Sequence, residues 1–390
     1  MLQSPGMLSR RVISLGNFFS AAHFFLIIFI ITPYLATLVP ERETGYVISL
    51  GALVSLAAFP LLPRLVRAIG QRHLAIGLAL FEIILLTWLA FTEDPLSAIL
   101  LVALGSAAAP FISYQLDLLL EASITAEDAT GRVRTAFLTM ANIALIAAPL
   151  AVGYLLGESD DYARVFLAAA ASLVPFIVLL LAYRLPEGTP PSLTNIRTTI
   201  RCVFNNRDLA SVTFAHFVLQ CFYHLAPVFI PLYLHTALGI PWSELGWIFA
   251  VMLLPFILFE YPAGWLADRK FGDKEIMVIG FLIMGVAFAA VAVIDAATPI
   301  YITVAILVAT RVGAALADSM TEGHFFRRVS ERDANTISVF RMLRPLAALS
   351  APALGSVLLV SSGYGTLFVV TGLAVAVLGA VAARRIIDIR

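Results

Sequence analysis

The sequence has few of the residues that keep a protein dissolved in water. Only 13% of its 390 residues are charged and 61% are hydrophobic, whereas a soluble domain carries about 25% charged residues. The formal net charge is zero, which argues against nucleic acid as a partner. Neither of the two lysines, Lys270 and Lys274, follows a G-x-x-x-x-G loop, which excludes a Walker ATP site. The two cysteines imply no disulfide framework. Because metalloprotease, nucleophile-elbow and clustered Cys/His motifs are also absent, we predict no enzymatic activity, metal or cofactor.

Long apolar runs take the place of charge. Each of twelve stretches is long enough to cross a membrane, which takes about 20 apolar residues. The loops between them that would face the cytoplasm carry twenty of the 25 Lys and Arg residues, and the opposite loops carry two. This bias predicts a multi-pass protein of the plasma membrane (the inner membrane in a Gram-negative cell) with both termini in the cytoplasm. The predicted spans are 15–38, 44–62, 73–92, 96–120, 135–157, 164–184, 209–237, 243–266, 275–294, 298–318, 337–360 and 364–383.

The two halves of the sequence repeat one another. ETGYVISL at 43–50 resembles ELGWIFAV at 244–251, an offset of 201, and Pro149 matches Pro352 at an offset of 203. We therefore predict an all-α integral membrane fold of two pseudo-symmetric six-helix bundles. Apolar residues at helical spacing between the bundles favour a short amphipathic helix over a disordered linker. The predicted parts are an N-terminal bundle (1–184), a cytoplasmic linker (185–208) and a C-terminal bundle (209–390).

A charged loop lies between the second and third span of the second half. Its residues are Gly264, Leu266, Ala267, Asp268, Arg269, Gly272 and Lys274. With the six-plus-six spans and the linker, this loop resembles the signature G-x-L-A-D-R-x-G-[RK]-[RK] of the major facilitator superfamily. The first-half copy keeps Arg67, Gly70 and Arg72, but Val66 replaces the acid. The resemblance implies that the loop latches the two halves together on the inner side; the alternative is a hydrophilic turn held inside by its charge.

The resemblance also implies a function. A member of this family would be a secondary active transporter that moves a small organic solute by alternating access, through a site surrounded by spans 1, 4, 7 and 10. We expect a monomer in the lipid bilayer, driven by protons because titratable groups are present and an ATP motif is absent; export and import both remain open. The alternatives are a non-transporting receptor or lipid scramblase on the same scaffold, or a membrane enzyme that uses His216, His224 and Glu260.

Span 7 has the densest set of polar residues. Positions i, i+4, i+7 and i+8 of one helical face are occupied by His216, Gln220, Tyr223 and His224. Such a stripe in an apolar span either contacts cargo or forms hydrogen bonds between helices. His23 in span 1 and Tyr114 in span 4 are further candidate substrate ligands.

Ionisable residues at membrane depth are functional candidates because each is costly to bury. Arg311 is predicted either to bind an anionic substrate or to pair with a carboxylate such as Asp318. Glu260 is predicted to carry the coupling proton, or to pair with Arg341 or Arg344. Glu82, midway along span 3, has no evident partner in the sequence.

Further charges are expected near the inner ends of spans 4, 5, 10 and 11. We interpret them as an inner gate of salt bridges that break and re-form as the halves rock. The gate residues are Asp117, Glu121, Arg134, Asp318, Glu322, Arg341 and Arg344.

Overall fold

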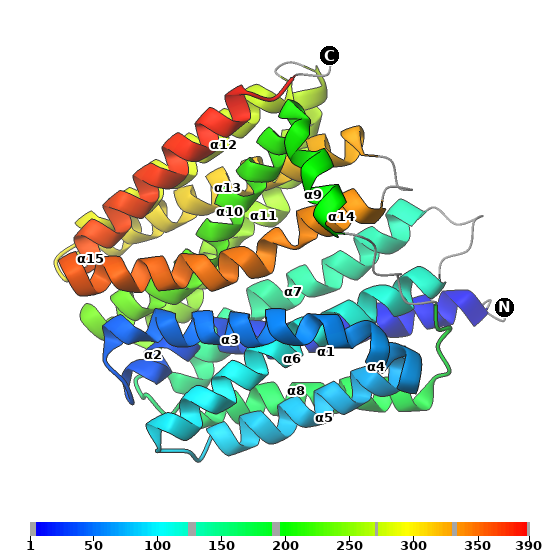
Figure 1. Ribbon diagram of the computed structural model, residues 1–390. Coiled ribbons are helices and arrows are strands. Elements are labelled where there is room, and N and C mark those ends of the chain that lie inside the picture. Colours follow the sequence, from blue (N-terminus) through cyan, green and yellow to red (C-terminus); the bar gives the residue numbers. More distant parts are fainter. Residues whose placement is uncertain (1–4, 124–129, 189–195, 270–271, 330–333, 388–390) are drawn as a thin grey trace. The chain divides into compact units, whose positions relative to one another are not determined.

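The computed structural model describes residues 5–123, 130–188, 196–269, 272–329 and 334–387, and every regular element in them is helical (Figure 1). The chain divides into two compact units. The first contains residues 1–192 and 240–250, and the second contains residues 193–239 and 251–390.

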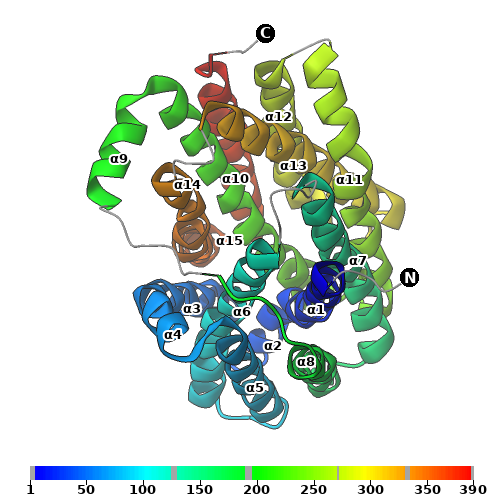
Figure 2. The ribbon, with the colours of Figure 1, turned by 90° about the vertical axis from the view of Figure 1, so that its right-hand side faces the viewer.

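The first unit is built around α1. This helix packs against α6, α7 and α8, while α5 packs against α6 and α8, and α3 against α6. Figure 2 looks nearly along the axes of α1 and α8 in this unit. The helices are α1 (Pro5–Ile28), α2 (Ile31–Ala36), α3 (Thr44–Ala58), α4 (Leu62–Ile69), α5 (Gln71–Leu89), α6 (Pro95–Ser123), α7 (Thr130–Leu156) and α8 (Ala163–Ala182).

The second unit is built around α12. This helix packs between α13 and α15, and α10 packs against the same two helices. Within this unit, α9 contacts α10 and α14. The helices are α9 (Ile196–Asn205), α10 (Arg207–Pro231), α12 (Asp273–Ala290), α13 (Ile300–Arg328), α14 (Ala334–Arg341) and α15 (Leu343–Arg384); α11 (Trp242–Arg269) starts among residues of the first unit and ends in the second.

The described residues contain eleven helices that are long and apolar enough to cross a membrane. The last of them, Val339–Arg384, has 46 residues, more than twice the roughly 20 that one crossing needs. Gly363 interrupts it with φ 77° and ψ −179°, and Figure 1 shows two arms of α15 meeting at a sharp turn. This turn falls between the predicted spans 337–360 and 364–383. The all-helical fold with twelve crossings is therefore confirmed.

The internal repeat is visible in the backbone before the third long helix of each unit. Gly70 precedes α5 with φ 82° and ψ 160°, and Gly272 precedes α12 with φ 79° and ψ 164°. L side chains rarely adopt such positive φ values, so glycine is required at both positions. The two glycines are 202 residues apart, within one residue of the offset between the sequence repeats.

The turns before α6 and α13 repeat as well. Asp94 accepts a hydrogen bond from the Ser97 backbone N–H at 2.8 Å, and Asp295 accepts one from the Thr298 hydroxyl at 2.7 Å. The hydroxyl groups of Ser97 and Thr298 hold the pKa of these two exposed carboxyls below the usual value. The two aspartates are 201 residues apart. The duplication thus includes an aspartate that accepts a hydrogen bond within the turn before this helix of each unit.

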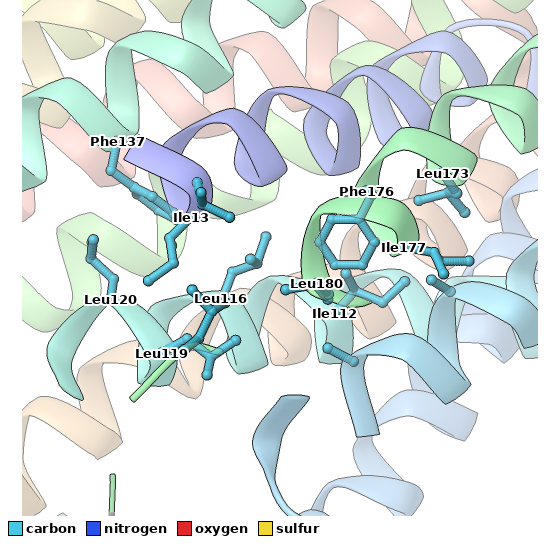
Figure 3. Close-up of a cluster of buried hydrophobic side chains, with 14 residues drawn as sticks. Ile13, Ile112, Leu116, Leu119, Leu120, Phe137, Leu173, Phe176, Ile177 and Leu180 are labelled. Atoms are coloured by element: carbon cyan, nitrogen blue, oxygen red, sulfur yellow. The ribbon is translucent and has the colours of Figure 1, made fainter. Parts of the chain in front are cut away.

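The core of the first unit is a set of apolar side chains shared by five helices (Figure 3). Ile13 of α1, Ile112 and Leu116 of α6, and Leu173 and Phe176 of α8 are fully buried. Lipid tails are as apolar as these side chains, so burial from water does not drive helices together inside a membrane. Close packing and the dispersion energy it provides hold this core instead.

Helices α12 and α13 approach through glycine. A Cβ atom built on Gly313 would lie 2.3 Å from the backbone nitrogen of Met284 and 2.6 Å from the carbonyl oxygen of Gly280. Backbone atoms cannot move aside as the end of a flexible side chain can. The spacing of these two helices therefore depends on the absence of a side chain at Gly313.

We expect Gly313→Ala to destabilise the protein by about 1–3 kcal/mol, because the added methyl group overpacks a rigid contact. The measurement is thermal unfolding of the purified protein in detergent. The matched control is Gly77→Ala, since a Cβ atom added to Gly77 of α5 would meet no other atom within 4 Å. Equal unfolding temperatures for Gly313→Ala and the parent protein would contradict the close approach.

Candidate functional site

The polar stripe of α10 lies in the second unit. His216 and Gln220 are 1% and 3% exposed, and Tyr223 and His224 are half-buried. Helix α10 continues through Pro227 to Pro231 and then changes to a π-helical turn, Leu232–Ala237. Turns of this type alter the direction of side chains and are frequent at functional sites.

His216 is held by aromatic stacking. Its ring lies 3.9 Å from the ring of Phe340 at an angle of 24°, and Phe340 stacks in turn on Phe325 at 3.9 Å. Both ring nitrogens of His216 are buried, and neither has a hydrogen-bond partner among the described residues. Buried polar atoms normally have partners. The two nitrogens therefore form an incomplete hydrogen-bonding set next to an aromatic wall.

Arg311 of α13 lies beside the same stripe. It is 4% exposed, and its guanidinium carbon lies 5.1 Å from the centre of the Phe222 ring, a cation–π contact. Tyr223 lies within electrostatic reach of both Arg311 and Asp318. No ion pair within 4 Å is found for Arg311 in the part of the chain that the structure describes, and its Nε atom has no hydrogen-bond partner there.

A second cation acts on the stripe from α15. Arg344 exerts an electrostatic effect on His216, Tyr223 and His224. Its Nη2 atom lies 3.1 Å from Oε1 of Glu322, and both side chains are about half exposed to the surroundings, at 57% and 43%. The structure thus brings the predicted stripe together with two arginines, one of which is salt-bridged to Glu322.

The other predicted residues are more scattered. In the first unit, the ring of Tyr114 packs 6.0 Å from that of Phe59, Glu121 is exposed, and Asp117 is half-buried. In the second unit, Arg341 is exposed. The side chains of Arg134 and Glu260 lie outside the described residues.

A charge cluster that the sequence analysis did not anticipate lies at one end of the second unit. The buried imidazole of His324 in α13 joins two buried carboxylates: its Nδ1 atom is 3.1 Å from Asp273 of α12, and its Nε2 atom is 3.2 Å from Asp208 of α10. Two carboxylates can both accept hydrogen bonds from one ring only if both ring nitrogens carry hydrogen. Each ring nitrogen of His324 therefore faces one carboxyl group, and the imidazole bridges α10 and α12.

Two arginines and the chain's last described residues complete the cluster. Arg327 forms an ion pair with Asp273, and Nε of Arg328 lies 2.8 Å from Oδ2 of Asp208. The backbone N–H of Ile387 donates to Asp208 at 2.7 Å. We call the residues Asp208, Asp273, His324, Arg327 and Arg328 the His324 cluster; it ties α10, α12, α13 and the segment after α15 together.

Nearly the whole sequence matches one family of known proteins. The family model of the Major Facilitator Superfamily matches residues 13–242 and 212–388. The chain belongs to the major facilitator superfamily. It is thus a multi-pass protein of a superfamily of membrane transporters, and the family resemblance is confirmed. No curated protein matches the chain in sequence.

Solved transporters share the fold of this superfamily member. A bacterial homologue of the human lysosomal transporter Spinster, in an inward-facing and unoccupied conformation, aligns with a TM-score of 0.77 at 13% identity, over 99% of this chain and 98% of that one. The nucleoside transporter NupG aligns with a TM-score of 0.76 at 14% identity, over 97% and 98%. A point mutant of NupG aligns with a TM-score of 0.76 at 15% identity, over 96% and 98%. At such identities the likeness concerns the fold.

The superfamily signature falls across a helix end. Helix α11 continues to Arg269 and therefore contains Gly264, Asp268 and Arg269. The side chains of Asp268 and Arg269 lie outside the described residues. The acidic residue at the start of the next helix is Asp273, directly after Gly272. A carboxylate at this position interacts favourably with the helix dipole.

The first unit places a carboxylate at the equivalent helix start by another route. Val66 occupies the signature's acidic position, but Oε2 of Glu187, a residue after α8, accepts a hydrogen bond from the Gln71 backbone N–H at 3.0 Å. The Gln71 side chain also exchanges two hydrogen bonds with the backbone of Gly188. Both copies of the signature region therefore hold an acid at the N-terminus of their third long helix.

A substitution in the His324 cluster can test whether His324 bridges Asp208 and Asp273. His324→Gln removes the ring that bridges two buried carboxyl groups, and removing one partner from a buried charged network costs about 3–5 kcal/mol. We expect a lower unfolding temperature in detergent. His73→Gln is the matched control, because His73 is exposed on α5. If His324→Gln unfolds at the temperature of the control, His324 does not bridge the two aspartates.

Proposed function

We propose that this protein is a secondary active transporter that moves a small organic solute bearing an anionic group by alternating access, with protons as the coupling ion. Its two six-helix halves would rock about one central site, as in other carriers built from repeats. The cargo site would lie on α10 and α13, and the Lys- and Arg-rich loops would face the cytoplasm.

The proposal rests on the surroundings of the buried Arg311 side chain. A buried guanidinium at membrane depth needs a counter-anion, and none is found for it within 4 Å among the described residues. The unpartnered ring nitrogens of His216 and the nearby Arg344 add hydrogen-bond donors and positive charge to the same face. A carboxylate or phosphate group on the solute would satisfy this face, and an aromatic or apolar remainder would fit against Phe222 and Phe340.

Proton coupling is supported by titratable groups at membrane depth in both units. The salt bridge of Glu322 with Arg344 would belong to an inner gate that changes as the halves rock. The similar solved structures include a nucleoside transporter, so nucleosides and their phosphates belong in the first set of solutes to test.

We expect Arg311→Gln to weaken binding of an anionic solute at least about tenfold, because a hydrogen bond to a charged group contributes about 1.5–3 kcal/mol. Thermal-shift measurements on a panel of organic acids, nucleotides, nucleosides and neutral solutes would identify a ligand. Its flux would then be measured in proteoliposomes with and without an imposed pH gradient.

The control for this substitution is Arg42→Gln, because Arg42 is exposed in the turn before α3. Equal affinities in Arg311→Gln and the control would remove Arg311 from the site. Saturable solute flux would support a transporter. Lipid exchange between leaflets without solute flux would indicate a scramblase. Ligand binding without solute flux or lipid exchange would indicate a receptor.

Asp268→Asn tests the predicted latch. We expect it to change the rate of solute flux while leaving membrane insertion and the unfolding temperature unchanged, because the carboxylate would act on the conformational change rather than on folding. Flux is compared at equal amounts of reconstituted protein. Unaltered flux would show that the signature loop serves topology alone.

A further inference from the structure

A histidine and a glutamate meet inside the first unit. His23 lies on α1 and Glu82 on α5, and Nε2 of His23 is 3.9 Å from Oε2 of Glu82. The residues are 1% and 2% exposed. From the sequence we expected His23 to contact cargo and found no partner for Glu82. In the structure the two side chains lie next to each other.

The pair lies deep in the membrane-spanning part of both helices. Glu82 is eleven residues after the start of α5 at Gln71 and seven before its end at Leu89, so about 16 Å and about 10 Å from the two ends. His23 lies near the middle of the apolar span Leu8–Ala36. Both side chains therefore sit at the level of the hydrocarbon core, where water is absent.

The neighbouring helix α6 makes room for the carboxylate. A Cβ atom built on Gly105 would lie 3.3 Å from Oε2 of Glu82, so the missing side chain leaves space for this oxygen. Nε2 of His23 is buried and has no hydrogen-bond partner among the described residues. The 3.9 Å separation from Glu82 is longer than a hydrogen bond, and a shift of about 1 Å would close it.

Other ionisable groups are remote from the pair. The nearest along each helix packed against α1 or α5 are Arg11, Arg67, His73, Tyr114, Arg134 and Arg164. His73 and Tyr114 are nine residues from Glu82 and Gly105, or about 13 Å. Arg67 precedes α5, and Arg164 at the start of α8 is exposed and forms an ion pair with Asp161 at 2.8 Å.

The two remaining arginines are separated from His23 by several helical turns. Arg11 is twelve residues before His23, about 18 Å along the helix. Arg134 precedes Phe137, and the Phe137 carbonyl accepts a hydrogen bond from Asn17, which is six residues before His23. His23 and Glu82 are therefore each other's counter-groups.

Mutual isolation determines how many protons the pair holds. Starting from a carboxylate and a neutral imidazole, one added proton makes the pair neutral overall, whichever residue carries it. Removing that proton leaves an anion, and adding a second leaves a cation, each at a cost of the order of several kcal/mol in a dry interior. The pair therefore exchanges protons only when its surroundings change, as they do when a buried site opens to water.

We infer that His23 and Glu82 form a proton-binding site inside the first unit and, on the proposed function, that this is where the coupling proton is held. The proton is taken from water on one side and returned to water on the other, and only an O–H or N–H bond forms or breaks. His23 and Glu82 belong to the first unit, whereas Glu260 and the arginine-bearing face of α10 and α13 belong to the second.

The test is infrared difference spectroscopy of the full chain in lipid nanodiscs between about pH 5 and about pH 9, a range that brackets the ordinary titration of carboxyl and imidazole groups. The readout is the carbonyl stretch of a protonated carboxylic acid. We expect Glu82→Gln to abolish one such band and Glu43→Gln, at an exposed glutamate, to leave it. His23→Gln should move the pH midpoint of the band by at least about one unit, a tenfold change in proton affinity.

Two outcomes would overturn the inference. A spectrum that Glu82→Gln leaves unchanged would make the pair a fixed ion bridge, and an unmoved midpoint in His23→Gln would show that the two groups titrate independently. If Glu82→Gln does not yield folded protein, Glu82→Asp keeps the carboxylate and should shift the frequency of the band. No cargo is needed, so a Glu82 band in a protein without solute flux would overturn the transport proposal while supporting the proton site.

Discussion

Water is absent from the hydrocarbon core of a membrane, and most of this structure follows from that absence. The backbone must satisfy its own hydrogen bonds, so every regular element described is a helix. Helices gain nothing by hiding apolar side chains from lipid, so they associate where packing is closest, as at Gly313 against Met284. An ionisable side chain in this environment needs a group of opposite charge or a hydrogen-bond partner close to it.

These groups divide by depth. At the helix ends, Asp208, Asp273 and His324 lie close together with two arginines and form a dense, mutually satisfied cluster. At membrane depth the sets are smaller and less complete: His23 and Glu82 stand 3.9 Å apart, and Arg311 rests on the face of an aromatic ring. A complete network stabilises one arrangement, whereas an incomplete one leaves room for a proton or a solute. On the proposed function, this contrast would separate residues that hold the fold from residues that serve transport.

The sequence predicted the elements well because hydropathy and glycine are local signals. The turn at Gly363 and the twelve crossings follow directly from runs of apolar residues. It could not predict the partners, because they come from distant segments: Glu82 is 59 residues from His23, and Asp208 is 116 from His324. The face of α5 that lies toward α1 is set by tertiary packing, and it cannot be predicted from the sequence of α5 alone. The same limit explains Asp273, which lies in the signature loop but has no evident role until the helix is seen to start there.

The duplication shows how the two units came to differ. At the repeat offset of 201, His23 corresponds to His224, so a histidine is present in both halves. Glu82 corresponds to Ile283, and Arg311 corresponds to Pro110, so the acid is found only in the first half and the arginine only in the second. The shared positions, such as Gly70 with Gly272 and Asp94 with Asp295, shape turns and helix ends and are needed by any copy of the scaffold. The unshared ones are costly buried charges of opposite sign, which neither helix needs in order to fold. The proposed division of labour, with proton binding in the first unit and anion binding in the second, would account for both asymmetries at once.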